Sequence, residues 1–318
     1  MAGQVKMTAV APRQSMPAGG ASSTAGTASQ KALGMLPSPS LAQRWRGSRN
    51  LLPALIFLGL FFSAPLIALL LRGVLEPVPG LGNYEQLFAN SAYSRVLLNT
   101  FSVAGLVTLF SLLLGFPLAW VITLVPRGWG RWILNIVLLS MWTSLLARTY
   151  SWLVLLQASG VVNKALMAMG IIDQPLEMVH NLTGVVIGMS YIMIPFSFLP
   201  LQATMQAIDP MVLQAGSICG ASPWSNFFRV FLPLCRPGLF SGGLMVFVMS
   251  LGYYVTPALL GGAQNMMLPE FIVQQVQSFL NWGLASAAAA LLVLITLVLF
   301  YFYLKLQPES PVGASNAR

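Results

Sequence analysis

Six long apolar segments constrain the fold of this chain more than any other feature of its sequence. Each is about twenty residues or longer, enough for an α-helix rising 1.5 Å per residue to cross about 30 Å of hydrocarbon. Their approximate bounds are Leu51–Leu71, Leu97–Val125, Trp132–Leu156, Leu182–Leu201, Leu239–Leu260 and Leu284–Leu304. Because the segments are continuously apolar, the predicted fold class is an all-α integral membrane protein with six transmembrane helices.

Charged residues are scarce, which narrows the chemistry that the chain can perform. Of its 318 residues 57% are hydrophobic and only 7% charged, whereas soluble domains carry about 25% charged residues. One histidine and two cysteines are too few for the common zinc clusters. None of the four lysines stands in a Gly-Lys-Ser/Thr phosphate loop. We therefore expect a non-catalytic chain that binds no metal, no cofactor and no ATP itself.

The net charge of +9 is distributed unevenly between the connections. If the N-terminus is inside, twelve lysines and arginines lie in inner segments and three in outer loops, whereas five of the seven acids lie outside. Cytoplasmic loops of membrane proteins carry such an excess of basic residues. We therefore predict that both termini are cytoplasmic, and we attribute the positive charge to this orientation and not to a nucleic-acid partner.

Composition divides the chain into three regions. Residues 1–49 are a basic cytoplasmic tail, expected to be disordered because it has too little apolar surface to offset the entropy of ordering. Residues 50–306 are the six-helix domain, and residues 307–318 are a second cytoplasmic tail. The inner loop at 202–238 is unusually long, and long loops in compact bundles are often functional.

This inner loop contains the sequence signals of two short helices. Asp209-Pro210 supplies an N-cap and a first-turn proline, and Gly220 is a typical helix stop. Ser222-Pro223 repeats the start signal for a second helix through about Val230, and Leu232-Pro233 and Arg236-Pro237 are expected to end it and lead into the fifth segment. Two short helices that meet at a glycine form either a rigid unit that can be pushed by a partner or an ordinary interfacial helix–turn–helix. We call residues 209–234 the paired-helix loop.

The paired-helix loop resembles the EAA signature of ABC importer permeases, which reads E-A-A, three residues, G, nine residues and I-x-L-P. The spacing matches, since Gly220 follows Gly216 by four residues and Val230 follows Gly220 by ten. Gln214 replaces the usual Glu, and Gly216 replaces the second Ala, which adds flexibility to the helix. The resemblance implies that an ATPase docks on Gln214, Ala215, Gly216, Gly220, Ala221, Val230, Leu232 and Pro233.

Other strings are similar to those of spermidine/putrescine-type permeases, namely 148–152, 160–163, 191–196 and 254–262. With the loop, the resemblance covers about residues 50–305. It implies the six-helix type I ABC importer permease fold in a bacterial cell inner membrane. It also implies three kinds of protein partner: a cytoplasmic ABC ATPase dimer that binds the ATP, a second homologous permease and a periplasmic solute-binding protein. The expected cargo is a small, cationic, polyamine-like solute.

One arginine and several aromatic residues lie in the predicted outer halves of the third to fifth segments. Aromatic rings are typical of the membrane interface, but they also suit cation–π contacts with ammonium groups along a pathway. The arginine has either a structural role or faces the pathway, where it would repel a cation. The candidate pathway residues are Trp142, Arg148, Tyr150, Tyr191, Tyr253 and Tyr254.

Other functions remain open at this point. A stand-alone secondary carrier or channel usually has ionisable residues at mid-membrane, and Arg148 is the only charge well inside a segment. A membrane-bound enzyme would need a cluster of buried acids, histidines or cysteines, which the segments lack. If the chain is an importer permease, an amino-acid derivative, an opine or a phosphonate is an alternative cargo.

Overall fold

The computed structural model describes residues 52–306, and every regular element in this range is helical. The all-α fold class predicted from the sequence is therefore confirmed. The two expected tails, 1–49 and 307–318, lie outside the described residues. The chain divides into two compact units between Pro65 and Leu66.

The described part of the first unit is a single apolar helical stretch. The α-helical turns of residues 52–58 pass into a π-turn, η1 (Gly59–Ser63), shortly before Pro65. Because proline lacks an N–H and its ring crowds the preceding turn, the wider π-turn lets the helix continue past it. Phe57 and Phe61 lie one turn apart with ring centroids separated by 4.9 Å.

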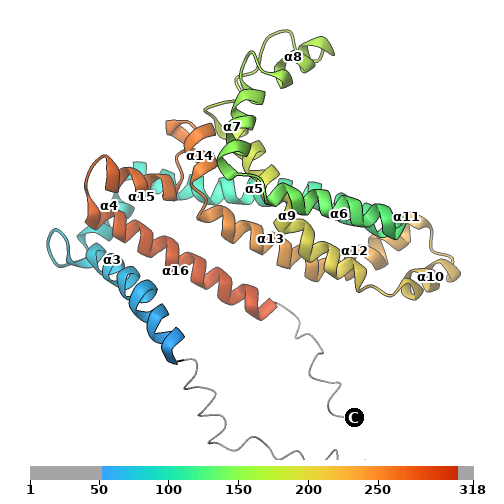
Figure 1. Cartoon of the computed structure of the whole chain (residues 1–318), viewed down its shortest axis with the longest axis horizontal. Helices are drawn as coiled ribbons and strands as arrows, with labels where there is room; N and C mark the ends of the chain where they lie inside the picture. Colours follow the sequence, from blue (N-terminus) through green and yellow to red (C-terminus); the bar gives the residue numbers. More distant parts are fainter. Residues whose placement is uncertain (1–51, 307–318) are drawn as a thin grey trace, which may run out of the picture. The chain divides into compact units, whose positions relative to one another are not determined.

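The second unit contains the other helices, from the body of α3 onward (Figure 1). Their bounds are α3 (Ala64–Leu75), α4 (Gly82–Ala89), α5 (Ser91–Leu124), α6 (Arg127–Met141), α7 (Leu145–Leu156), α8 (Val161–Ala168), α9 (Leu182–Gln206), α10 (Pro210–Ile218), α11 (Pro223–Asn226), η2 (Phe227–Phe231), α12 (Leu232–Leu234), α13 (Arg236–Leu251), α14 (Val255–Leu260), η3 (Ala263–Asn265), α15 (Leu268–Gln277) and α16 (Trp282–Leu306).

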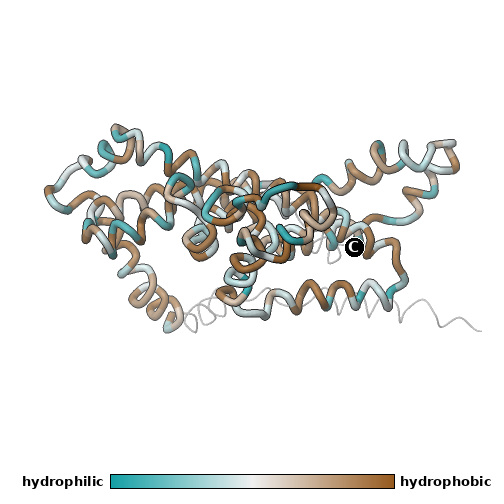
Figure 2. The backbone as a smooth tube through the Cα atoms, turned by 90° about the horizontal axis from the view of Figure 1, so that it is seen from above, coloured by the Kyte–Doolittle hydropathy of each residue, from teal (hydrophilic) through white to brown (hydrophobic). Residues whose placement is uncertain are grey.

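Five helical stretches among the described residues are long and apolar enough to cross a membrane, and a bent pair adds a sixth. Figure 2 shows that the long helices are mostly apolar along their length. The bent pair joins Pro223–Leu234 to Arg236–Leu251 at an angle of 57°. The number of predicted spans agrees with the structure if this pair is one span. The five stretches are Leu52–Leu75, Ser91–Leu124, Leu145–Ala168, Leu182–Gln206 and Trp282–Lys305.

The third predicted segment, Trp132–Leu156, is not one helix. It is interrupted between the end of α6 at Met141 and the start of α7 at Leu145. The hydroxyls of Ser140 and Thr143 each donate to a carbonyl three residues earlier. Such side-chain bonds offer the backbone alternatives to the regular helical ladder. The candidate span therefore runs through α7 and α8 instead.

The fifth predicted segment, Leu239–Leu260, is also interrupted. α13 ends at Leu251 with Gly252 as its C-cap, and the short α14 begins at Val255. Glycine is a poor helix former and is common at helix ends. Mean hydropathy cannot show either interruption, because Gly, Ser and Thr hardly change the apolar character of a twenty-residue window.

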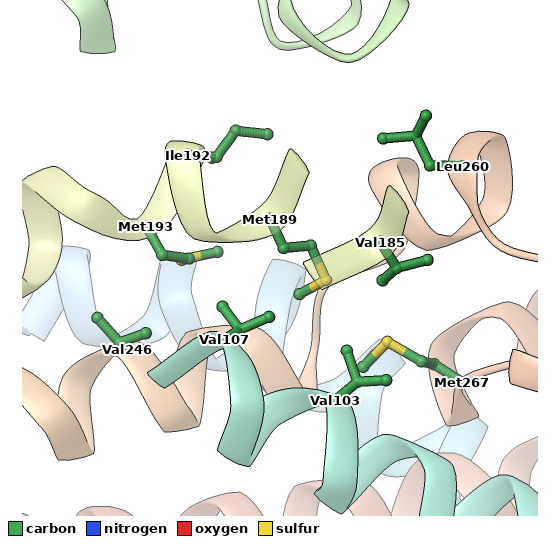
Figure 3. Packing of buried hydrophobic residues seen from close by; sticks show 9 residues of the cluster. All are labelled: Val103, Val107, Val185, Met189, Ile192, Met193, Val246, Leu260 and Met267. Carbon is green, nitrogen blue, oxygen red and sulfur yellow. The ribbon is translucent and has the colours of Figure 1, made fainter. Parts of the chain in front are cut away.

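The core of the second unit lies where α5, α9 and α13 meet. A Cβ atom added to Gly115 would lie 2.5 Å from Ser197 Oγ, and one added to Gly242 would lie 2.8 Å from Ser197 O. Ser197 Oγ donates to Ser111 O at 2.9 Å. Such small residues let helix backbones approach closely in membrane proteins. Figure 3 shows one cluster of buried apolar side chains of the core, namely Val103, Val107, Val185, Met189, Ile192, Met193, Val246, Leu260 and Met267.

Candidate functional site: the paired-helix loop

The first helix of the paired-helix loop starts as its sequence predicts. Asp209 is the N-cap of α10, and its side chain accepts a hydrogen bond from Met211 N at 2.9 Å. Pro210 occupies the first turn, where a missing N–H costs nothing because that donor has no helical partner. The predicted start signal is therefore confirmed.

Gly220 ends this helix in a left-handed conformation. Its φ is +81°, a region that residues with a Cβ adopt at a cost. Gly220 N donates to Ser217 O at 3.0 Å, and Ala221 N donates to Gly216 O at 3.1 Å. These two bonds form a Schellman motif, which satisfies carbonyls that the end of a helix leaves unpaired. The predicted helix stop is confirmed.

The second helix begins where predicted but runs further. Ser222 Oγ accepts a hydrogen bond from Ser225 N at 3.3 Å, which caps α11. The helix then passes through the π-turn η2 into α12 and ends at Leu234, so Leu232-Pro233 does not end it, whereas the next helix, α13, does begin at Arg236-Pro237. The π-turn directly before Pro233 accommodates the missing N–H and the ring, as η1 does before Pro65.

Aromatic rings attach the paired-helix loop to α5. The ring of Phe227 lies 4.9 Å from that of Trp120 and meets Phe116 edge-on at 6.2 Å, measured between centroids. Phe231 is buried and also contacts Phe116, at 6.5 Å. Each aromatic pair of this kind contributes about 0.5–1.5 kcal/mol beyond the area it buries. Sequence reasoning missed this contact, although the spacing of four between Phe116 and Trp120 places both rings on one face of α5.

Other apolar side chains of the loop are uncovered. Met211, Ile218 and Trp224 are 70%, 85% and 73% exposed. Trp224 stacks on the exposed ring of Phe228, with centroids 6.1 Å apart and an angle of 17° between the ring planes. Clustered apolar groups that face away from a protein's own core are typical of interaction sites. The loop thus combines a fixed internal geometry with a surface suited to a protein partner.

The residues of the predicted docking motif all lie in this loop but differ in accessibility. Exposed are Gln214, Ala215 and Gly220, whereas Gly216, Ala221, Val230, Leu232 and Pro233 are half-buried. The exposed members can touch a partner directly. The half-buried members contribute to the shape of the loop. The motif therefore includes residues that shape the loop as well as residues on its surface.

The predicted pathway residues do not converge on one point. Trp142 is 88% exposed, and Tyr150 and Tyr254 are exposed as well. Neither Arg148 Nε nor the Tyr253 hydroxyl has a hydrogen-bond partner among the described residues, although both atoms are buried.

Tyr191 instead lines an apolar groove of about 600 Å³ formed by α5, α7 and α9. Trp152 packs edge-on against Tyr191 with ring centroids 5.6 Å apart. None of the lining residues is acidic. A cation in this groove would therefore meet aromatic faces and the Ser190 hydroxyl, and would find no counter-charge there.

Comparisons with known proteins place these features in a wider context. Residues 89–309 match the family described as binding-protein-dependent transport system inner membrane component. This range contains α5 to α16 and the whole paired-helix loop.

Curated relatives and solved structures are similar to this chain as well. The spermidine/putrescine transport system permease protein PotB of Haemophilus influenzae is 34% identical over 205 residues, 64% of this chain and 71% of that protein. PotB of Escherichia coli K12 is 32% identical over 207 residues, 65% and 75% of the two chains. A chain of a bacterial ABC transporter involved in the import of the acidic polysaccharide alginate has the same fold, with a TM-score of 0.67 and 21% identity over 84% of this chain and 96% of that one.

Proposed function

Because this chain belongs to the family of binding-protein-dependent transport system inner membrane components, we propose that it is the permease subunit of an ATP-driven importer that carries a polyamine. The observation that carries the proposal is the paired-helix loop. Its two helices are capped at fixed points, its exposed apolar side chains suit a protein partner, and aromatic rings join it to α5. Such a unit can transmit a rigid-body movement to a membrane-spanning helix.

The proposed complex has three further kinds of subunit. A dimer of cytoplasmic ABC ATPases supplies the energy, which fits a sequence without a phosphate loop. A second homologous permease completes the pathway. A periplasmic solute-binding protein delivers the solute, and the family description supports a binding protein as a partner. Because Gln214 carries no charge, it cannot form an ion pair with the ATPase, whereas the exposed side chains of Ile218 and Trp224 are available for apolar contacts.

A polyamine is the cargo that the comparisons favour. Both PotB relatives are named for spermidine and putrescine transport and are about one third identical to this chain. The rings of Trp152 and Tyr191 suit ammonium groups. One observation favours a second cargo class, a small solute with an anionic group such as an opine or a phosphonate. The buried Nε of Arg148 lacks a hydrogen-bond partner among the described residues and suits such a group.

Uptake of radiolabelled putrescine and spermidine tests the cargo. Cells in which the gene is deleted should lose most saturable uptake at micromolar concentrations, and a plasmid copy should restore it. Unlabelled spermidine should compete, whereas 2-aminoethylphosphonate and octopine should not. Unchanged polyamine uptake in the deletion strain would refute the polyamine assignment, and competition by the phosphonate or the opine would favour the anionic class.

The energy source separates an importer from a secondary carrier. Uptake should stop when arsenate depletes ATP, and should persist when a protonophore collapses the ion gradient while ATP is maintained. The opposite pattern would identify a carrier that works without an ATPase.

A further inference from the structure

Gly216 occupies a place in α10 where a glycine needs an explanation. Glycine destabilises the interior of a helix relative to alanine, and the usual residue of the EAA signature at this position is alanine. The backbone of Gly216 is not left-handed, in contrast to that of Gly220. The explanation is therefore a close approach by another part of the chain, and not a special backbone conformation.

The group that approaches is the side-chain amide of Asn226. A Cβ atom added to Gly216 would lie 2.6 Å from Asn226 Oδ1 and 3.2 Å from its Cγ. Asn226 Oδ1 is buried and has no hydrogen-bond partner among the described residues. An alanine at position 216 would therefore displace this amide or push the two helices apart.

The other end of the same amide holds the two helices together. Asn226 Nδ2 donates to Leu213 O at 2.8 Å and lies 3.4 Å from Ser217 Oγ. Leu213 O also accepts from Ser217 Oγ at 3.2 Å. The amide of Asn226 thus spans one turn of α10, bonded to the turn before Gly216 and packed against Gly216 itself.

Asn226 is also the residue directly before the aromatic contact with α5. Its neighbour Phe227 contacts Trp120, with ring centroids 4.9 Å apart. A change in the position of Asn226 relative to α10 therefore changes how α10 is connected to α5.

We propose that Gly216 and Asn226 form an interlocking pair that sets the angle between the two helices of the paired-helix loop, and thereby couples movement of α10 to α5. This inference rests on the proposed function for its transport consequence. Gly216 and Asn226 are positioning residues in this arrangement. The glycine interpreted from the sequence as a source of flexibility is a point of contact.

A double-mutant cycle in the intact transporter complex tests the pair. Gly216→Ala, the residue that the family signature prefers, should lower polyamine uptake per ATP hydrolysed by about fivefold. Asn226→Ala should also lower it, because the bond to Leu213 O is lost. Adding Gly216→Ala to Asn226→Ala should cause no further loss, since the new methyl group fills the space that the amide leaves. Gly128→Ala is the matched control, because a Cβ there has no atom within 4 Å.

Two results would refute the proposal that Gly216 and Asn226 form an interlocking pair. One is wild-type coupling in Gly216→Ala, and the other is an equal loss from Gly216→Ala with and without Asn226→Ala. Membrane levels of each variant are measured in parallel, and the lack of further loss in the double variant separates a coupling defect from misfolding.

A second measurement does not depend on transport. Spin labels on the exposed native Cys219 and on Phe228→Cys report the distance between the two helices, while the buried Cys235 stays unlabelled. The distance distribution should be narrow in the otherwise unchanged chain and broader or shifted with Gly216→Ala. An identical distribution would refute the interlocking pair even if transport is impaired. If Gly216→Ala changes the distribution while the unaltered chain moves no polyamine, the pair stands and the proposed cargo is refuted.

Discussion

At the scale of single residues, the two helix starts and the glycine stop in the paired-helix loop follow their immediate sequence. Asp209 and Ser222 cap the helices that follow them, and Gly220 adopts the left-handed conformation expected of a helix stop. These helix ends are set locally, because the hydrogen-bond donors and acceptors of each cap are at most a few residues apart in the sequence. Gly216 differs, because the need for a glycine at this position comes from the close approach of Asn226, which is ten residues later and on another helix.

Gly220 allows the effect of charge to be separated from the effect of backbone strain. A Cβ at this position meets no atom within 4 Å, and Asn and Asp both tolerate the left-handed region. We predict that Gly220→Asp lowers uptake by about tenfold or more, because a buried, unpaired carboxylate at a docking interface costs several kcal/mol. Gly220→Asn, which has the same shape without the charge, should retain uptake within about twofold.

Uptake and ATP hydrolysis by the two variants are compared at equal membrane levels. If Gly220→Asp and Gly220→Asn transport equally well, Gly220 does not face a docked partner.

At the scale of helices, hydropathy predicts that segments exist but not how they are broken. The apolar runs around Thr143 and Gly252 are continuous in the sequence, yet the helices end there. The contact between α5 and the paired-helix loop is equally invisible to hydropathy, because Trp120 and Phe227 are apolar residues among many others.

The Trp120 contact predicts a coupling defect. Trp120→Ala removes the ring against which Phe227 packs, so uptake per ATP hydrolysed should fall by about fivefold while ATP hydrolysis continues. Trp120→Phe keeps an aromatic ring and should retain most coupling. Trp129→Ala on α6 is the control, since Trp129 is 69% exposed. Equal uptake by Trp120→Ala and Trp129→Ala would show that the contact between Trp120 and Phe227 does not couple ATP hydrolysis to uptake.

At the scale of the whole molecule, the orientation in the membrane is a prediction from the distribution of charge. The chain has two cysteines, of which Cys219 is exposed in the paired-helix loop and Cys235 is buried. The unaltered protein therefore carries one natural probe of the side on which this loop lies.

A membrane-impermeant maleimide should label Cys219 in inverted vesicles and leave it unlabelled in intact cells. Cys219→Ser should abolish the labelling, and a bound ATPase should protect Cys219, which is adjacent to Gly220. Labelling of intact cells would place the loop outside and contradict the predicted cytoplasmic termini.

The sequence by itself determined the class of fold, the number of apolar segments, the family, and in the candidate site the two helix starts and the stop at Gly220. Each of these depends on composition, on signature spacing, or on groups that are close together along the chain. Only the tertiary structure decided that Trp132–Leu156 is two helices, that Phe227 packs on Trp120 and that Asn226 fills the space beside Gly216. The interhelical contacts join residues that are distant in the chain. The break between α6 and α7 is accompanied by hydrogen bonds from the Ser140 and Thr143 hydroxyls, which mean hydropathy does not record.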